Sequence, residues 1–196
     1  MNRSGLFLDR DGTINEEVDF LTNPLDLRLI PRAAGAIREA NESGFKVFII
    51  TNQSGIARGL LTEERLGEIH AALESKLAAH GAKIDAIYYC PHHPDFGQPP
   101  LRGDCDCRKP GTGMIDRAVA AFGIDVRKSF VIGDRMIDVQ TGNNAGATSV
   151  LVLTGYGREE LELCRRNGVP IGHTAADLYA AVQYARQSLL QVQERS

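Results

Sequence analysis

The stretch "GLFLDRDGTIN" (residues 5–15) decides the fold, because an apolar run ends there in a cluster of charges. The run Leu6–Leu8 predicts a strand buried on both faces of a sheet. Asp9, Arg10 and Asp11 follow it directly, and Gly12 lets the chain turn away at once. Charged side chains that leave the core together predict a functional site at the end of this strand.

Four further apolar runs predict strands of the same sheet: "KVFIIT" (46–51), "AIYYC" (86–90), "SFVIGD" (129–134) and "TSVLVLTG" (148–155). Helical patterns lie between or after them, at residues 31–44, 62–81, 113–123 and from 177 onward. Alternation of this kind predicts an α/β fold with a doubly wound, Rossmann-like parallel sheet and helices on both faces. The length of 196 residues predicts a single domain over 1–196.

Composition excludes several classes of protein. The chain is 43% hydrophobic and 24% charged, as in ordinary globular proteins, and its net charge of −3 provides no broad basic surface for nucleic acid. No run is long enough to cross a bilayer, and residues 1–11 lack the pattern of a secretory signal. We therefore expect a cytoplasmic protein without nucleic-acid or membrane partners. The lack of a long apolar stripe favours a monomer.

Polar residues gather at three predicted strand ends: Asp9 and Asp11, Thr51 and Asn52, and Asp134 and Asp138. The carboxyl ends of parallel strands form the ligand crevice of such sheets. Carboxylates two residues apart repel each other unless a cation lies between them or one holds a proton. With a divalent cation present, Asp9 suits a nucleophile and Asp11 a general acid and base.

Phosphoryl transfer also needs groups that stabilise the negative charge on the transferred oxygens. Thr51 offers a hydroxyl and a backbone N–H, and Lys109 offers a fixed cation. Asp134 is a hard oxygen ligand suited to Mg²⁺. The sequence therefore predicts a phosphate-directed enzyme whose Mg²⁺ is held by Asp9, Asp11 and Asp134.

The proline-rich segment 90–110 predicts a zinc-binding loop outside the sheet. Cys90, His92, Cys105 and Cys107 form two close pairs that can surround a tetrahedral Zn²⁺. His92 is the preferred nitrogen ligand, with His93 as the alternative, and unligated thiols are the competing interpretation. Cys164 lies far from this segment and is expected to be a spare thiol. His70, His80 and His173 are expected to be surface residues without a function.

Four motifs, in this order, resemble those of the haloacid dehalogenase superfamily of phosphatases: "DRDGT" (9–13), "IITN" (49–52), "RKPGTGM" (108–114) and "GDRMID" (133–138). The resemblance implies a Rossmann-like fold, catalytic Mg²⁺ and an aspartyl-phosphate on Asp9, with Asp11 as acid and base. It further implies that Thr51 and Lys109 bind the phosphoryl group and that Asp134 binds the metal. Asp138 would support either Lys109 or the metal shell.

The details "TNQSGIARG" (51–59), "CPHHP" (90–94) and "CDCRKP" (105–110) resemble the zinc-loop branch of that superfamily, which has no cap domain. Within this branch, the sequence resembles the heptose bisphosphate phosphatases more closely than the histidinol-phosphatases. The implied reaction is removal of the C7 phosphate of D-glycero-D-manno-heptose 1,7-bisphosphate, on the route to nucleotide-activated heptose for lipopolysaccharide. The residues implied to line the substrate are Arg10, Glu17, Val18, Asp19, Phe20, Asn52, Gln53, Ser54 and Arg108.

Two alternatives to this function stay open. The first is hydrolysis of histidinol phosphate on the same machinery. The second, from a different class, is a non-catalytic zinc-stabilised binding module. Every residue type that the reaction requires is present, which favours an enzyme. Neither the segment between Asp11 and the "IITN" strand nor the segment after the third predicted strand has room for a full cap domain. We therefore expect short loops, namely residues 16–20 and the zinc loop, to determine specificity.

Overall fold

The computed structural model describes residues 3–193, which contain one six-stranded parallel sheet with the strand order β3-β2-β1-β4-β5-β6. Every neighbouring pair is parallel; Leu6, for example, lies opposite Val47 on one side and Phe130 on the other. The strands are β1 (Gly5–Leu8), β2 (Lys46–Asn52), β3 (Ala86–Cys90), β4 (Phe130–Gly133), β5 (Thr148–Val152) and β6 (His173–Ala175).

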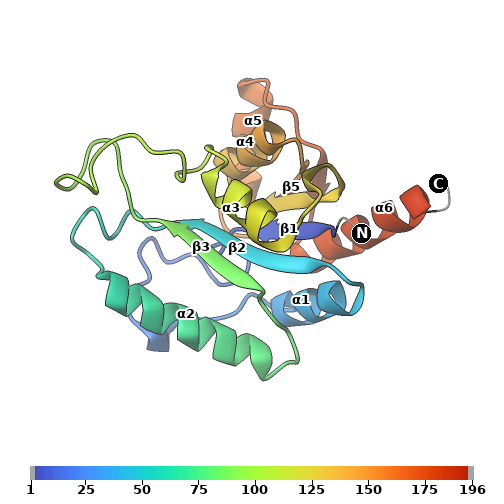
Figure 1. Cartoon of the computed structure of the whole chain (residues 1–196), viewed down its shortest axis with the longest axis horizontal. Coiled ribbons are helices and arrows are strands. Elements are labelled where there is room, and N and C mark those ends of the chain that lie inside the picture. The colour runs from blue at the N-terminus through green and yellow to red at the C-terminus, as the bar shows by residue number, and fades with distance from the viewer. Residues whose placement is uncertain (1–2, 194–196) are drawn as a thin grey trace.

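Helices cover both faces of this sheet (Figure 1). One face packs against α1 (Ala33–Glu42), α2 (Glu63–Ala78) and α6 (Leu178–Gln193). The other packs against α3 (Gly113–Phe122), α4 (Met136–Ala145) and α5 (Gly157–Arg166). Two short 3-10 helices, Pro24–Asp26 and Val126–Lys128, lie in connections. The predicted doubly wound fold is confirmed.

Alternation along β1 explains why both faces need a cover. Leu6 and Leu8 pack into the core beneath α1, α2 and α6, whereas Phe7 points to the opposite face and stacks on Phe48 with ring centroids 5.1 Å apart. All three β1 side chains are fully buried. This two-sided burial is why the strand reads as an unbroken apolar run.

The predicted helix boundaries hold to within two or three residues. Thr62 caps α2, since its Oγ1 accepts a hydrogen bond from the Arg65 backbone N–H. Gly123 ends α3 in the left-handed conformation with φ of 65°. The helix predicted from residue 177 onward corresponds to α6, and residues 194–196 lie outside the described residues. The single-domain organisation stays a prediction.

Helix α4 and strand β6 are among the elements that have no counterpart in the predicted strands and helices. Helix α4 carries Gly142, Asn143 and Asn144, which are weak helix formers, and it has no apolar stripe. Strand β6 is three residues long and contains no apolar run. Both are held by tertiary packing: α4 against β4 and β5, and β6 by its pairing with β5.

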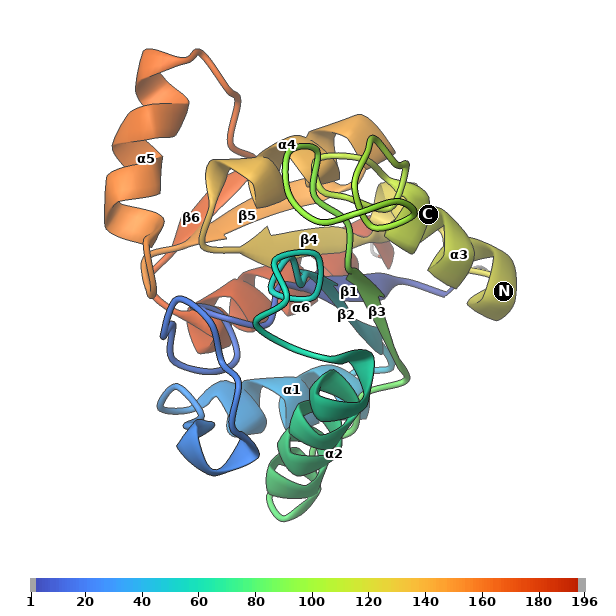
Figure 2. The same ribbon diagram turned by 90° about the vertical axis from the view of Figure 1, so that its left-hand side faces the viewer.

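The loops that follow β1, β2 and β3 gather at one end of the sheet (Figure 2). They span residues 9–32, 53–62 and 91–112 and contain no domain-sized insertion among the described residues. The described part of the chain thus has the expected capless architecture, with an irregular loop after β3. No helix within residues 3–193 combines the length and the apolar character that crossing a bilayer requires.

Candidate active site

The site lies where the strand order reverses, between β1 and β4. The chain runs outward from β1 through β2 to β3, and returns to pair β4 on the other side of β1. Such a switch point leaves a crevice at the carboxyl ends of the strands. The Asp9 backbone N–H donates to the Ile132 carbonyl at 2.9 Å, which fixes the first aspartate at this point.

A buried cluster of three carboxylates and one ammonium forms the centre of the crevice. Lys109 Nζ donates to Asp9 Oδ1 at 2.8 Å and to Asp138 Oδ1 at 2.5 Å. Asp138 is bound further by the Arg135 backbone N–H at 3.0 Å. Burial alone would lower the pKa of Lys109, but Asp138 and Asp9 raise it, so the ammonium stays charged. Asp138 therefore supports Lys109.

The same cluster fits a divalent cation. Carboxylate oxygens of Asp9, Asp134 and Asp138 all lie within 4.8 Å of one another. Asp134 Oδ1 is buried and has no hydrogen-bond partner among residues 3–193. Burial, together with neighbouring carboxylates, raises the pKa of Asp9 to about 7 and that of Asp134 to about 8. A hard cation that takes oxygen ligands would relieve this repulsion.

Two glycines enclose Asp134. Gly12 (φ +76°) and Gly155 (φ +52°) adopt the left-handed conformation, and a Cβ on either would collide with the Asp134 carboxylate. The Tyr156 backbone N–H donates to Asp134 Oδ2 at 2.9 Å. The carboxylate is thus positioned by main chain from the loops after β1 and β5.

The Asp11 carboxylate is separate from the acidic cluster. It accepts hydrogen bonds from Arg10 Nη2 at 2.7 Å, Asn15 Nδ2 at 2.8 Å and Gln53 Nε2 at 3.1 Å. Burial opposes its ionisation, but the Arg10 charge and these hydrogen bonds outweigh burial and lower the pKa of Asp11. This side chain is therefore held ionised, apart from the oxygens of Asp9 and Asp134.

Arg10 is almost completely buried, and its guanidinium contacts His70 of α2. The Arg10 side chain is 1% exposed, and its Nη1 lies 3.4 Å from His70 Nε2. Burial, followed by the Arg10 charge, lowers the pKa of His70 to about 4, so the imidazole is neutral and can accept this hydrogen bond. The expectation that His70 is a surface residue is wrong, because α2 turns it toward the crevice.

The end of β2 also provides polar groups to the pocket that Asp9 lines. Thr51 is buried, and its Oγ1 accepts from Gln53 Nε2 at 2.9 Å. Asn52 uses both atoms of its amide: Oδ1 accepts from the Lys109 backbone N–H at 3.0 Å, and Nδ2 donates to the Lys109 carbonyl at 3.3 Å. Strand β2 therefore positions Lys109 across 57 residues of sequence.

The four predicted zinc ligands converge in the loop after β3. Cys105 Sγ lies 3.5 Å from Cys90 Sγ and 3.4 Å from Cys107 Sγ. His92 Nδ1 lies 3.6 Å and 3.4 Å from the sulfurs of Cys90 and Cys107. Ligand edges of about 3.5–3.8 Å are expected around a tetrahedral Zn²⁺ with Zn–S near 2.3 Å, so the set fits the ion. His92, rather than His93, is the residue turned inward.

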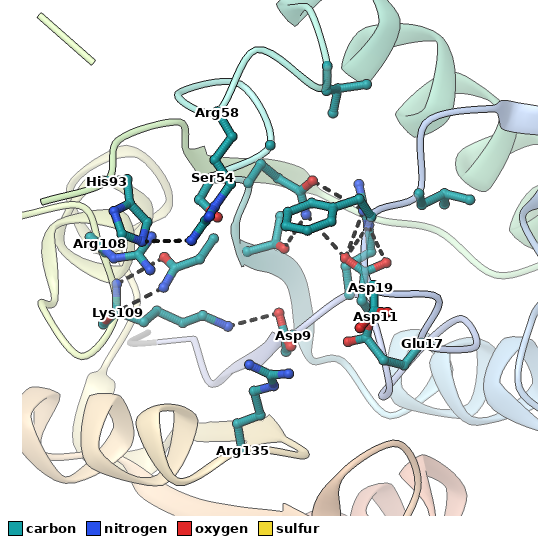
Figure 3. A pocket seen from close by; sticks show the side chains of 18 of the residues that line it. Asp9, Asp11, Glu17, Asp19, Ser54, Arg58, His93, Arg108, Lys109 and Arg135 are labelled. Atoms are coloured by element: carbon teal, nitrogen blue, oxygen red, sulfur yellow. Dashed lines mark hydrogen bonds and ion pairs between the residues drawn. The ribbon is translucent and has the colours of Figure 1, made fainter. Parts of the chain in front are cut away.

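A pocket of about 300 Å³ opens over Asp9 (Figure 3). Of the residues expected to line the substrate, all but Val18 line this pocket; Val18 is 47% exposed. Lining residues that the sequence interpretation missed are Leu21, Thr22, Gly55, Arg58, Leu61, His93, Arg135 and Ile137. Arg58 stands in the quoted stretch "TNQSGIARG" and Arg135 in "GDRMID", so position within these motifs was the available signal.

One side of the pocket is organised by Tyr156. The guanidinium carbon of Arg135 lies 4.3 Å from the centroid of the Tyr156 ring, as in a cation–π contact. The Tyr156 hydroxyl donates to Asp19 Oδ1 at 3.1 Å. Asp19 has a φ of 57°, a strained conformation for a residue with a side chain. Loop 16–20, which we expected to determine specificity, is therefore tied to the loop after β5.

Comparison with known proteins gives consistent matches. Residues 106–181 match a family model described as HAD-hydrolase-like. The chain is 41% identical over 183 residues to a D-glycero-D-manno-heptose-1,7-bisphosphate 7-phosphatase of Chlorobaculum tepidum, covering 90% of this chain and 91% of that one. It is also 37% identical to a protein of the same name from Thermosynechococcus vestitus, over 94% of this chain and 96% of that one.

A solved structure matches in fold as well as in sequence. It is the D,D-heptose 1,7-bisphosphate phosphatase of B. bronchiseptica complexed with magnesium and phosphate. The TM-score is 0.81 at 36% identity, over 95% of this chain and 98% of that one.

Proposed function

Since the chain belongs to the haloacid-dehalogenase-like hydrolases, among the heptose-1,7-bisphosphate 7-phosphatases, we propose that it removes the C7 phosphate of D-glycero-D-manno-heptose 1,7-bisphosphate through an aspartyl-phosphate. The observation that carries the chemistry is the buried Asp9–Lys109–Asp138 cluster beneath the pocket. It places a carboxylate and a fixed cation at the end of one strand, as phosphoryl transfer requires.

In the first step a carboxylate oxygen of Asp9 attacks phosphorus, and the bond between phosphorus and the C7 oxygen breaks. Asp11 donates a proton to that oxygen, so the sugar leaves as the alcohol. In the second step Asp11 accepts a proton from a water that attacks the phosphorus. This releases inorganic phosphate and restores the Asp9 carboxylate.

The Arg10–Asp11 pair bears on both steps. The lowered pKa keeps Asp11 ionised in the free enzyme, the form needed to accept a proton in the second step. A dianionic phosphoryl group beside Asp11 would raise its pKa, since a neighbouring negative charge favours the protonated form. Substrate binding thereby favours the acid needed in the first step.

Thr51 and Lys109 would stabilise the charge on the transferred oxygens, and Asp9 with Asp134 would hold Mg²⁺. When bound, Mg²⁺ neutralises phosphoryl oxygens and orients the group for in-line attack. The carboxylate of Asp11, the third Mg²⁺ ligand that the sequence predicts, does not belong to the set of carboxylates that converge here. Zn²⁺ on Cys90, His92, Cys105 and Cys107 would stabilise the loop without taking part in the chemistry. We expect a cytoplasmic monomer whose partner is the small phosphorylated sugar.

The test is phosphate release from the α and β anomers of the heptose bisphosphate and from histidinol phosphate, with and without Mg²⁺. We expect Mg²⁺-dependent turnover of a heptose bisphosphate, and a decrease of at least about 10⁴-fold in Asp9→Asn. The matched control is Asp125→Asn, which removes a carboxylate outside the crevice and should leave turnover unchanged. A strong preference for histidinol phosphate would overturn the substrate assignment. Absence of release from all three would revive the non-catalytic binding module.

A further inference from the structure

At the rim of the pocket, two hydrogen-bond donors face each other without an acceptor between them. The Asp95 backbone N–H donates to His93 Nδ1 at 3.0 Å. A ring nitrogen that accepts a hydrogen bond carries no hydrogen, so the imidazole is neutral and its hydrogen is on Nε2. Arg58 Nη2, which can only donate, lies 3.2 Å from this Nε2.

Arg58 is held in this position by aromatic rings. Its guanidinium carbon lies 3.8 Å from the centroid of the Phe96 ring and 5.9 Å from that of Phe20. The Phe96 ring also packs edge-on against His93, with centroids 4.7 Å apart. Stacking of this kind fixes the plane of the guanidinium while leaving its N–H groups free to donate.

The loops that carry the two donors are packed tightly together. A Cβ on Gly97 would lie 2.7 Å from the Ala57 carbonyl oxygen, so the loop after β3 lies directly on the loop after β2. Arg58 and His93 both line the pocket over Asp9, and Figure 3 shows them beside Arg108, away from Glu17 and Asp19. Arg108 is itself bound to the His92 carbonyl at 3.0 Å.

From this geometry we propose that Arg58 and His93 bind the distal phosphate of the substrate, the one that is not hydrolysed. One phosphate oxygen between Arg58 Nη2 and His93 Nε2 would accept from both donors and remove the unfavourable contact. The assignment rests on the proposed function, because it presumes a substrate with a second phosphate. It makes these two residues determinants of specificity for a bisphosphate over a monophosphate.

The experiment compares the heptose 1,7-bisphosphate with the 7-monophosphate, which lacks only the distal group. In Asp9→Asn enzyme, calorimetry measures the affinity for each sugar, and in otherwise unmodified enzyme kcat/KM is measured for each. We expect Arg58→Met to weaken binding and kcat/KM for the bisphosphate by about 10- to 100-fold and to change those for the monophosphate less than about threefold. His93→Phe, which keeps a ring against Phe96, should cost the bisphosphate about fivefold, and His93→Gln should recover part of this loss.

The controls separate recognition from loop structure. Arg65→Met removes an exposed arginine of α2 that pairs with Glu68 outside the pocket, and it should leave both sugars unaffected. The zinc content of each variant reports whether the loop is intact. Equal losses on both sugars, no loss on either, or a loss accompanied by loss of zinc would overturn the assignment. If the unmodified enzyme releases no phosphate, the proposed function fails, and the affinity ratio in Asp9→Asn still decides the role of Arg58 and His93.

Discussion

The two ligand clusters of this protein differ in what holds them together. The acidic cluster stands on the ends of β1 and β4 and at the start of α4, and Lys109 already supplies a positive charge among its carboxylates. The cluster of Cys90, His92, Cys105 and Cys107 contains one strand residue, and its other three ligands lie in irregular chain. The sheet prearranges the first cluster, whereas the second would depend far more on a bound Zn²⁺.

The clusters are nevertheless connected. Lys109 is two residues from Cys107, so the loop that the thiol cluster closes also delivers the cation of the acidic cluster. Asn52 binds both main-chain polar groups of Lys109 and is the second attachment of this residue. The difference between the clusters can therefore be tested by replacing, in turn, Lys109, the thiol of Cys105 and the buried His70 that contacts Arg10.

Of the changes that compare the two clusters, Lys109→Met is expected to have the largest effect. Without the ammonium, Asp9, Asp134 and Asp138 repel one another, and the transferred phosphoryl oxygens lose a fixed positive charge. We expect kcat/KM to decrease by about 10³-fold, measured by phosphate release. Lys46→Met, which removes a lysine–carboxylate pair with Asp85 at the other end of β2, is the matched control and should retain activity. A Lys109→Met variant with normal turnover would mean that the acidic cluster does not need its internal cation.

A smaller effect is expected from Cys105→Ser. Loss of this thiolate should release zinc and increase proteolytic cleavage within residues 91–108, and kcat/KM should decrease by about 10²-fold because Lys109 is displaced. Metal content, limited proteolysis and turnover are measured on the same preparation. Cys164→Ala removes the buried thiol that lies outside the cluster and should leave all three unchanged. Full zinc content in Cys105→Ser would contradict the ligand set.

The smallest effect concerns stability in acid. The folded protein holds His70 neutral with a pKa of about 4, whereas the unfolded chain has the ordinary value near 6.5. Between these values the unfolded state binds the extra proton, so stability is lost as the pH falls from 6.5 toward 4. We expect this histidine to account for about 2 kcal/mol of lost unfolding free energy between pH 6.5 and 5.

Chemical denaturation at both pH values measures this loss. The variant His70→Gln should show a shallower decline with pH than the unmodified protein, and His80→Gln, at an exposed position of the chain, should show the same decline as the unmodified protein. An unchanged slope in His70→Gln would mean that the imidazole titrates normally in the folded state.

The parts of the molecule that were predictable from sequence are those with a local signal. The buried strands appear as apolar runs, and the aspartates appear at their ends because strand ends are fixed by chain order. The Cys/His cluster was predictable because its ligands lie within 18 residues of one another. His70 was not predictable, since nothing local distinguishes a buried histidine on α2 from an exposed one.

Distances in sequence explain the other omissions. The contact of Arg58 with His93 spans 35 residues, and the hydrogen bond between Tyr156 and Asp19 spans 137. Each contact depends on how separate loops pack over the crevice, and none of these loops carries a periodic pattern. The choice between His92 and His93 was also left open by spacing, because adjacent residues satisfy the same ligand interval; the backbone of the loop decides it.

The enclosure of Asp134 by Gly12 and Gly155 has a consequence for how this crevice can change. Around Asp134 the crevice is shaped by the backbone of two glycines, and there is no room for a side chain at either position. Substitution at these two positions therefore cannot adjust the shape of the crevice. Substrate preference is therefore expected to vary through the loops that line the pocket, residues 16–20, 53–61 and 93–98. The two glycines thus fix the position of the Asp134 carboxylate, and differences in substrate preference are expected to come from the loops.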